Sequence, residues 1–171
     1  MSYFNQFGTI LYDPAGDGSA KLCTDIMSRV RIRASMKKEI VMLDTYAVKE
    51  NETPEIVADK HHGSPYYHWV VMLLNDISDV NHDWVKSTRQ LQKYLLSKYT
   101  ETQLTETHHY EIPQTSGDTT TMIEVENSTY PSATAITNYE YETALNESKR
   151  SIDLLRNDYL GYFTEEFANL I

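Results

Sequence analysis

The pattern of apolar and polar residues is most regular between residues 39 and 99, where it predicts a strand followed by helices. Residues 39–49 alternate with a period of two, which is typical of a β-strand. Thr53-Pro54 then supplies a helix N-cap with proline at the first helical position, and Gly63 supplies a left-handed residue that ends the helix. Ser64-Pro65 repeats the start signal, so a second helix follows almost at once.

The second predicted helix, from Pro65 to about Asn75, is apolar on nearly all sides, and only His68 interrupts its run of large apolar residues. A helix at a protein surface normally carries one apolar stripe. Each large side chain that is fully buried contributes about 1.5–3 kcal/mol, so another part of this chain, or another chain, should cover the second face. The candidate core or interface residues are Tyr66, Tyr67, Trp69, Val70 and Trp84, with Tyr159, Phe163 and Phe167 from the end of the chain.

The segments outside this core predict an arm, a hairpin and a tail. In the arm, Thr24 or Asp25 is a candidate cap for a short helix that runs to about Val30. A capping box at 87–90 predicts a helix to about residue 99.

The Thr-rich stretch that follows predicts a β-hairpin from residues 109–113 and 120–126, then a mobile loop at 128–137. The alternative is that the whole stretch becomes ordered only on binding. Residues 149–156 read as a short strand or the end of a helix. Asn157 or Asp158 would then cap a final amphipathic helix.

These elements together predict an α+β fold in four segments. Residues 1–38 form an extended N-terminal arm with a short helix, and residues 39–99 form the core with its following helix. Residues 100–138 form an inserted hairpin and loop, and residues 139–171 form a strand and an amphipathic helix.

Composition narrows the classes of partner. The formal net charge is −10, from 15 Lys and Arg against 25 Asp and Glu, which disfavours nucleic acid because its phosphate backbone is also negative. No apolar run approaches the roughly 18 residues of a membrane-spanning helix, and the first residues lack the pattern of a secretion signal. Cys23 is the single cysteine, so an intrachain disulfide is excluded, which fits a reducing cytosol.

Candidate chemistry is sparse, so we expect neither an enzyme nor a bound cofactor or metal. The pairs His61-His62 and His108-His109 are adjacent in sequence and cannot chelate as an i, i+4 pair does. Glycosidases use pairs of carboxylates. The candidates here, Glu101, Glu106 and Glu111, lie in a polar stretch with nothing to fix their separation. Arg29, Arg31 and Arg33 form a basic island, which is either a solvated face or a docking patch for an acidic partner.

Two family resemblances bear on the fold. The segment Val48-Lys-Glu-Asn-Glu-Thr-Pro-Glu-Ile-Val-Ala58, with Gly63 and Asn75, resembles a LysM module, in which Gly-Asp-Thr usually stands where this chain has Asn51-Glu52-Thr53. This resemblance implies a small βααβ core. In LysM modules these loop positions contact amino sugars, so the candidate glycan loop is Asn51, Glu52, Thr53, Gly63 and Ser64.

A second resemblance covers more of the chain. It is carried by Thr53-Pro-Glu55, Gly63-Ser-Pro-Tyr-Tyr-His-Trp-Val70, Asn75-Asp-Ile77, Asp83-Trp84, Tyr94-Leu-x-x-Lys-Tyr99 and Asn146-Glu-x-Lys-Arg150-x-Ile152. These motifs resemble the baseplate wedge protein 53 family of T-even-type contractile-tail phages.

The second resemblance implies a structural virion protein with a LysM-like core, assembled in the host cytoplasm. It would clamp neighbouring wedge proteins together around the central hub of the tail baseplate. Its implied partners are other wedge proteins, the sheath-initiator protein and the hub. The alternative hypothesis is a LysM-type module that binds peptidoglycan or chitin through the candidate glycan loop.

Overall fold

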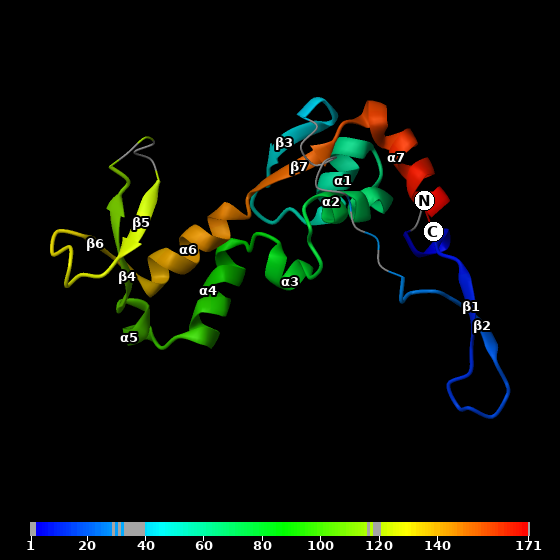
Figure 1. Cartoon of the computed structure of the whole chain (residues 1–171), viewed down its shortest axis with the longest axis horizontal. Helices are drawn as coiled ribbons and strands as arrows, with labels where there is room; N and C mark the ends of the chain where they lie inside the picture. Colours follow the sequence, from blue (N-terminus) through cyan, green and yellow to red (C-terminus); the bar gives the residue numbers. More distant parts are fainter. Residues whose placement is uncertain are drawn as a thin grey trace. The chain divides into compact units, whose positions relative to one another are not determined.

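The computed structural model describes residues 3–28, 30, 32, 40–115, 117 and 121–170. It has an α+β fold, as the sequence predicts, with helices and three small antiparallel sheets in the described residues (Figure 1). The chain divides into two compact units: unit 1 is Met1–Trp84 with Ser151–Ile171, and unit 2 is Val85–Arg150. Unit 2 is therefore inserted between the two chain segments that build unit 1.

A two-stranded sheet connects the two segments of unit 1. Strand β3 (Leu43–Ala47) pairs antiparallel with β7 (Ser151–Leu155), with Leu43 opposite Leu155 and Ala47 opposite Ser151. The predicted strand is shorter than expected, because residues 40–42 form a 3-10 turn, η3 (Ile40–Met42). The ambiguous segment 149–156 forms a strand, so the partner of β3 comes from outside the 39–99 segment.

Local capping signals fix the helices that follow β3. Thr53 caps α1 (Pro54–His62), with Pro54 at its start, and Gly63 ends the helix with φ 72°. Ser64 caps the 3-10 turn η4 (Pro65–Tyr67), which leads directly into α2 (His68–Leu74). The predicted second helix thus begins as a tighter 3-10 turn. A short helix, α3 (Val80–Asp83), precedes Trp84.

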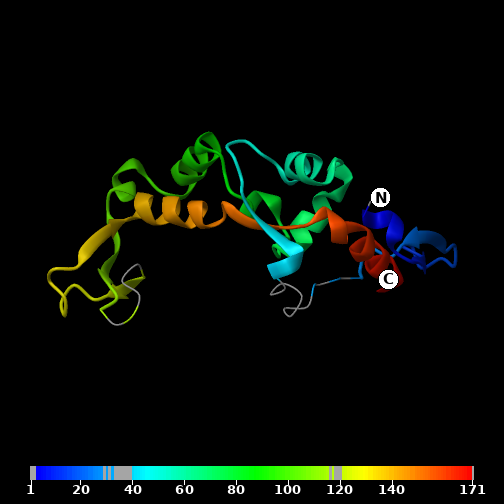
Figure 2. The same cartoon turned by 90° about the horizontal axis from the view of Figure 1, so that it is seen from above.

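The second apolar face of α2 is covered by this chain itself. Trp69 and Val70 of α2 pack in one cluster with Phe7, Leu155 and Phe167. Phe7 follows the N-terminal 3-10 turn η1 (Tyr3–Gln6), and Phe167 belongs to the terminal helix α7 (Asn157–Leu170). Both views draw η1 and α7 close together (Figures 1 and 2), as the ring contact of Tyr3 with Phe167 at 5.6 Å requires.

The arm of unit 1 forms a hairpin, and the described residues after it do not form the expected helix. Strand β1 (Thr9–Tyr12) pairs antiparallel with β2 (Lys21–Thr24). The short helix predicted from Thr24 or Asp25 to about Val30 is wrong over the described residues, where Asp25 caps a turn instead. Its Oδ1 accepts from the Met27 N–H at 3.0 Å, because a short carboxylate readily bonds its own local backbone.

The described residues of unit 2 form three helices and the third sheet. Helix α4 (Thr88–Lys98) begins with the predicted capping box of Ser87 and Gln90. The predicted hairpin is confirmed as β4 (Thr107–Pro113) with β5 (Met122–Val125). Two elements were missed: β6 (Thr134–Thr137), in the segment expected to be a mobile loop, and α6 (Asn138–Ser148). The remaining helix is α5 (Glu101–Leu104).

Candidate interaction surface

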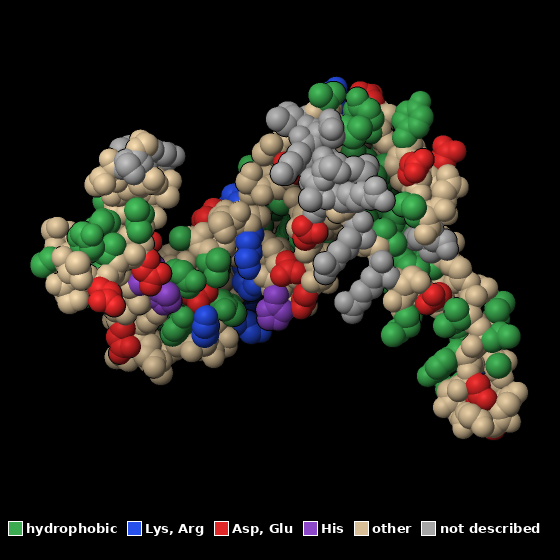
Figure 3. Space-filling view, in the orientation of Figure 1, with side chains coloured by type: hydrophobic (Ala, Val, Ile, Leu, Met, Phe, Trp, Pro, Cys, Tyr) green, Lys and Arg blue, Asp and Glu red, His purple; other side chains and the backbone are tan. Residues whose placement is uncertain are grey.

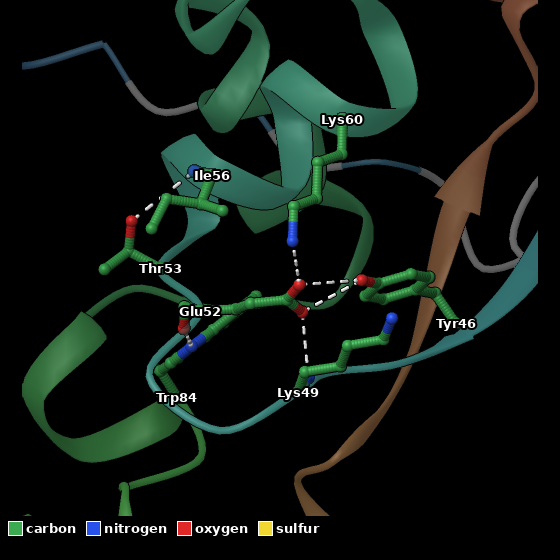
Figure 4. A network of polar contacts seen from close by, with 7 residues as sticks. All are labelled: Tyr46, Lys49, Glu52, Thr53, Ile56, Lys60 and Trp84. Atoms are coloured by element: carbon green, nitrogen blue, oxygen red, sulfur yellow. Dashed lines mark hydrogen bonds and ion pairs between the residues drawn. The ribbon is translucent and has the colours of Figure 1, made fainter.

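A buried carboxylate lies at the centre of the loop between β3 and α1. Glu52 is 7% exposed, and its carboxylate accepts from the Tyr46 hydroxyl at 3.0 and 2.9 Å, the Lys49 N–H at 2.8 Å and Lys60 Nζ at 2.6 Å (Figure 4). Burial alone would raise the pKa of this carboxyl. The hydrogen bonds from Lys60, the Lys49 amide and Tyr46 outweigh burial and lower the pKa below its ordinary value.

The backbone of Glu52 is held as well. The buried indole of Trp84 donates from Nε1 to the Glu52 carbonyl at 2.7 Å (Figure 4). This bond joins the loop before α1 to the last residue of the first segment of unit 1. Glu52 therefore forms hydrogen bonds with β3, with α1 and with Trp84. Its carboxylate is already occupied by donors of this chain.

The other residues of the candidate glycan loop also have roles in the scaffold. Asn51 is exposed and adopts a left-handed backbone with φ 63°. The Thr53 hydroxyl accepts from the Ile56 N–H at 3.5 Å, and Ser64 Oγ accepts from the Tyr66 N–H at 3.4 Å. The Gly63 N–H donates to the Asp59 carbonyl at 2.9 Å. Thr53, Gly63 and Ser64 thus begin or end helical segments.

The aromatic candidates divide between the interior and the surface. Trp69, Val70, Trp84 and Phe167 are all buried. The Trp69 ring lies 4.6 Å from that of Phe167 and 6.0 Å from that of Phe163, between ring centroids. Tyr67, Tyr159 and Phe163 are partly buried against the same cluster. Only Tyr66 is largely exposed, at 64%, so it is the one member of this set with most of its surface open to a partner.

Two asparagines of the motifs quoted for the second resemblance form side-chain hydrogen bonds with the backbone of a residue far away in the sequence. Asn75, at the end of α2, accepts from the Asp153 N–H at 2.9 Å and donates to the Asp153 carbonyl at 2.8 Å. In unit 2, Asn146 does the same with Lys86, accepting from its N–H at 2.8 Å and donating to its carbonyl at 3.0 Å. Each side-chain amide thus bonds both the N–H and the carbonyl of one backbone residue, as the backbone of a neighbouring strand would. Sequence reasoning quoted both residues but assigned them no role.

The histidines of α1 hold the start of α7. His61 Nε2 lies 3.0 Å from the Leu155 carbonyl, and His62 Nδ1 lies 2.9 Å from Asn157 Oδ1. The Asn157 amide donates to the His61 carbonyl at 2.7 Å, so this residue ties two helices together. The expectation that Asn157 or Asp158 is the cap before the final helix is wrong, since α7 includes both residues. Burial lowers the pKa of His62 against the opposing effect of Asn157.

Three polar candidates of unit 2, His108, His109 and Glu111, form a small local cluster. The His108 ring stacks on Tyr141 at 3.9 Å, and His109 Nε2 lies 2.8 Å from a carboxylate oxygen of Glu111. Glu101 lies in the first turn of α5, and Glu106 is exposed before β4. Among the residues that the structure describes, no group of three or more His, Cys, Asp or Glu could hold a metal ion. The basic island of Arg29, Arg31 and Arg33 lies outside the described residues.

Several of the most exposed apolar side chains of unit 1 lie on and beside the β1–β2 hairpin. Leu11 is 73% exposed, Leu22 68% and Met27 80%, and apolar side chains are visible along the hairpin in Figure 3. On α7, Tyr162 and Leu170 are also exposed. Unit 2 has its own exposed set, Leu96, Met122, Ile123, Tyr130, Tyr139 and Leu145.

Contiguous exposed apolar surface is typical of protein–protein contacts. The described helices include none long and apolar enough to cross a membrane. The exposed apolar side chains are therefore candidates for contacts with other proteins.

Comparison with known proteins agrees with this interpretation. No curated protein matches the chain. The family model described as base plate wedge protein 53 matches residues 22–133, which is well over half of the chain and includes α1, α2, α3 and α4. The chain therefore belongs to the base plate wedge protein 53 family and is a structural component of the phage tail baseplate, where it contacts other baseplate proteins.

Proposed function

We propose that this chain clamps neighbouring wedge proteins together around the central hub of the baseplate, as a non-enzymatic part of the virion. The observation that carries the proposal is the division into two units that each expose large apolar side chains. A chain with one such surface can attach to an assembly. A chain with two such surfaces can hold two neighbours, because each unit can then bury its apolar side chains against a different partner.

The kind of contact follows from the residues involved. Obligate interfaces are large and more apolar than transient ones, and the exposed residues Leu11 and Leu22 of unit 1 and Ile123 of unit 2 are suited to such contacts. The formal net charge of −10 favours partners whose facing surfaces are neutral or basic. The sequence resemblance suggests which proteins these are, namely other wedge proteins, the sheath-initiator protein and the hub, met after synthesis in the host cytoplasm.

Photo-crosslinking tests whether each unit contacts its own neighbour. A photoreactive amino acid would replace Leu11 in unit 1 or Ile123 in unit 2, within the full chain assembled with the other baseplate proteins of the same phage. A third variant with the photoreactive residue at Ser128, a polar and exposed position in unit 2, serves as the control.

We expect Leu11 and Ile123 to capture different baseplate proteins, or different copies of one protein, and Ser128 to capture far less. Capture of one and the same neighbouring molecule from both units would contradict the clamp. Capture from only one unit would also contradict it, because a clamp needs two attachments.

A further inference from the structure

The β1–β2 hairpin presents apolar side chains on both of its faces. Directly opposed residues share a face in an antiparallel pair, so Leu11 and Leu22 lie on one face while Ile10 and Tyr12 lie on the other. All residues of both strands are exposed. A strand that is apolar on both faces is typical of a sheet interior, and an isolated two-stranded hairpin is at best marginally stable in water. The hairpin is therefore suited to burial in another protein.

The hairpin also offers a free backbone edge on β1. Within the described residues each strand has a single neighbour. The Asp25 N–H donates to the Gly8 carbonyl at 2.8 Å, which fixes the alternation of hydrogen-bonded pairs along the ladder. It follows that the N–H and C=O groups of Thr9 and Leu11 point away from β2.

The outer edge of β2 is less open. The same alternation directs the backbone groups of Leu22 and Thr24 away from β1. However, the Thr24 carbonyl already accepts from the Ile26 N–H at 2.9 Å, so part of this edge is used within the chain. The edge of β1 is the better template for another strand.

Neither strand carries the features by which proteins block unwanted edge pairing. Proline, a bulge or several charges normally protect an exposed edge. Here the register from Thr9 to Tyr12 is continuous, neither strand contains proline, and Lys21 is the single charged residue of the two strands. The sheet of unit 2 differs, because β4 has an irregular register beside β6 and ends on Pro113.

We propose that β1 adds as an edge strand to a β-sheet of a neighbouring baseplate protein, which also covers the two apolar faces of the hairpin. This inference rests on the proposed function, because it names how unit 1 attaches to its neighbour. Addition of a strand supplies main-chain hydrogen bonds for affinity and alternating side chains for specificity.

Charge favours a different protein over a second copy of this chain as the occupant. The hairpin and its flanks carry Asp13, Asp17 and Asp25 against Lys21, and the whole chain has a formal net charge of −10. Two copies would bring like charges together at the tips and flanks of their hairpins. A sheet edge with neutral or basic surroundings fits better.

Hydrogen exchange on the assembled complex tests the proposal directly. The full chain would be co-expressed with the other baseplate wedge proteins of the same phage, and amide exchange compared between the free chain and the complex. We expect the amides of Thr9 and Leu11 to exchange freely in the free chain and to become protected in the complex. Unchanged exchange at both amides in a complex that does form would overturn strand addition and leave the clamp standing.

Two proline variants separate the two edges of the hairpin. Thr9→Pro removes an outward N–H from β1, and Thr24→Pro removes the corresponding N–H from β2. Both positions keep the inner ladder intact, since proline is tolerated where the N–H faces away from the neighbouring strand. Thr9→Val and Thr24→Val are the matched controls, because each removes the hydroxyl and retains the N–H. Tryptophan fluorescence of each free variant checks that the core is still folded.

We expect Thr9→Pro to weaken binding to the wedge proteins by about tenfold or more, as the loss of one good hydrogen bond implies. Thr24→Pro and both valine variants should bind as the wild type does. Equal binding of Thr9→Pro and Thr9→Val would overturn the proposal, as would protection of Thr9 in the chain alone through formation of a dimer. Failure of the wild-type chain to form any complex would overturn the proposed function and this inference with it.

Discussion

Replacement of Glu52 by glutamine tests whether this buried carboxylate organises unit 1. Glu52→Gln keeps the shape of the side chain and removes its charge. One amide oxygen can still accept from the Tyr46 hydroxyl and the Lys49 N–H, which are both bonded to one carboxylate oxygen in the wild type. The amide nitrogen would then face the ammonium of Lys60, so the bond from Lys60 is lost.

The expected loss of stability follows from these contacts. Hydrogen bonds to a charged partner contribute about 1.5–3 kcal/mol and neutral ones about 0.5–1.5 kcal/mol. Two bonds that change from charged to neutral therefore cost about 2 kcal/mol together, and the unfavourable contact with Lys60 adds to this. We expect Glu52→Gln to lower the free energy of unfolding of unit 1 by about 2–3 kcal/mol, which corresponds to a fall in Tm on the order of 10 °C.

Tryptophan fluorescence during thermal or denaturant unfolding measures this change. Both tryptophans of the chain, Trp69 and Trp84, lie in unit 1, so the signal reports on this unit. Lys60→Met is the matched control. It removes the other partner of the ion pair, whose side chain is 55% exposed, and should cost clearly less because the remaining donors still bind Glu52. Equal losses in the two variants, or no loss in Glu52→Gln, would refute the reasoning.

Three further predictions follow from other contacts. Trp84→Phe should destabilise unit 1 by about 1–3 kcal/mol more than Trp69→Phe in fluorescence-monitored denaturation. The reason is that Trp84 loses a hydrogen bond, whereas Trp69 Nε1 has no partner among the described residues. Equal losses would contradict this. The lowered pKa of His62 means that the unfolded chain takes up its proton first, so stability should fall as the pH drops below the ordinary value of 6.5. His62→Gln should flatten that part of the pH–stability curve, and an unchanged slope would show that another group is responsible. Asn146→Asp should destabilise unit 2 by about 1–3 kcal/mol in far-UV circular dichroism, because an oxygen would replace the buried amide that donates to the Lys86 carbonyl. An unaltered melting curve would contradict this role.

The parts of the fold that depend on neighbouring residues were predictable. Thr53, Gly63 and Ser64 fix helix ends through bonds within a few residues, and the sequence shows them directly. A similar signal for α6 was overlooked: Thr137 and Glu140 form a capping box of the same kind as Ser87 and Gln90. It stands in a polar stretch without clear periodicity, and for that reason the segment before it was expected to be a loop.

The parts that depend on distant residues were not predictable. Strand β3 pairs with β7, more than 100 residues further along the chain, and no local pattern identifies that partner. The apolar character of α2 showed that a second surface must cover it. Periodicity could not show that Phe7 and α7 would do so. Glu52 was a candidate sugar contact in the alternative hypothesis. Its hydrogen bonds with Tyr46 and Lys60 form only in the folded chain, so the sequence could not show that its carboxylate is already engaged.

The measurement that tests the clamp most directly is the light-scattering mass of the other baseplate wedge proteins, purified together with and without this chain. If the chain joins neighbouring wedge proteins, a complex that contains more than one of them should form only when the chain is present and should contain it in a fixed ratio. Wedge proteins that assemble to the same mass without the chain, or a chain that remains a monomer beside them, would contradict the account.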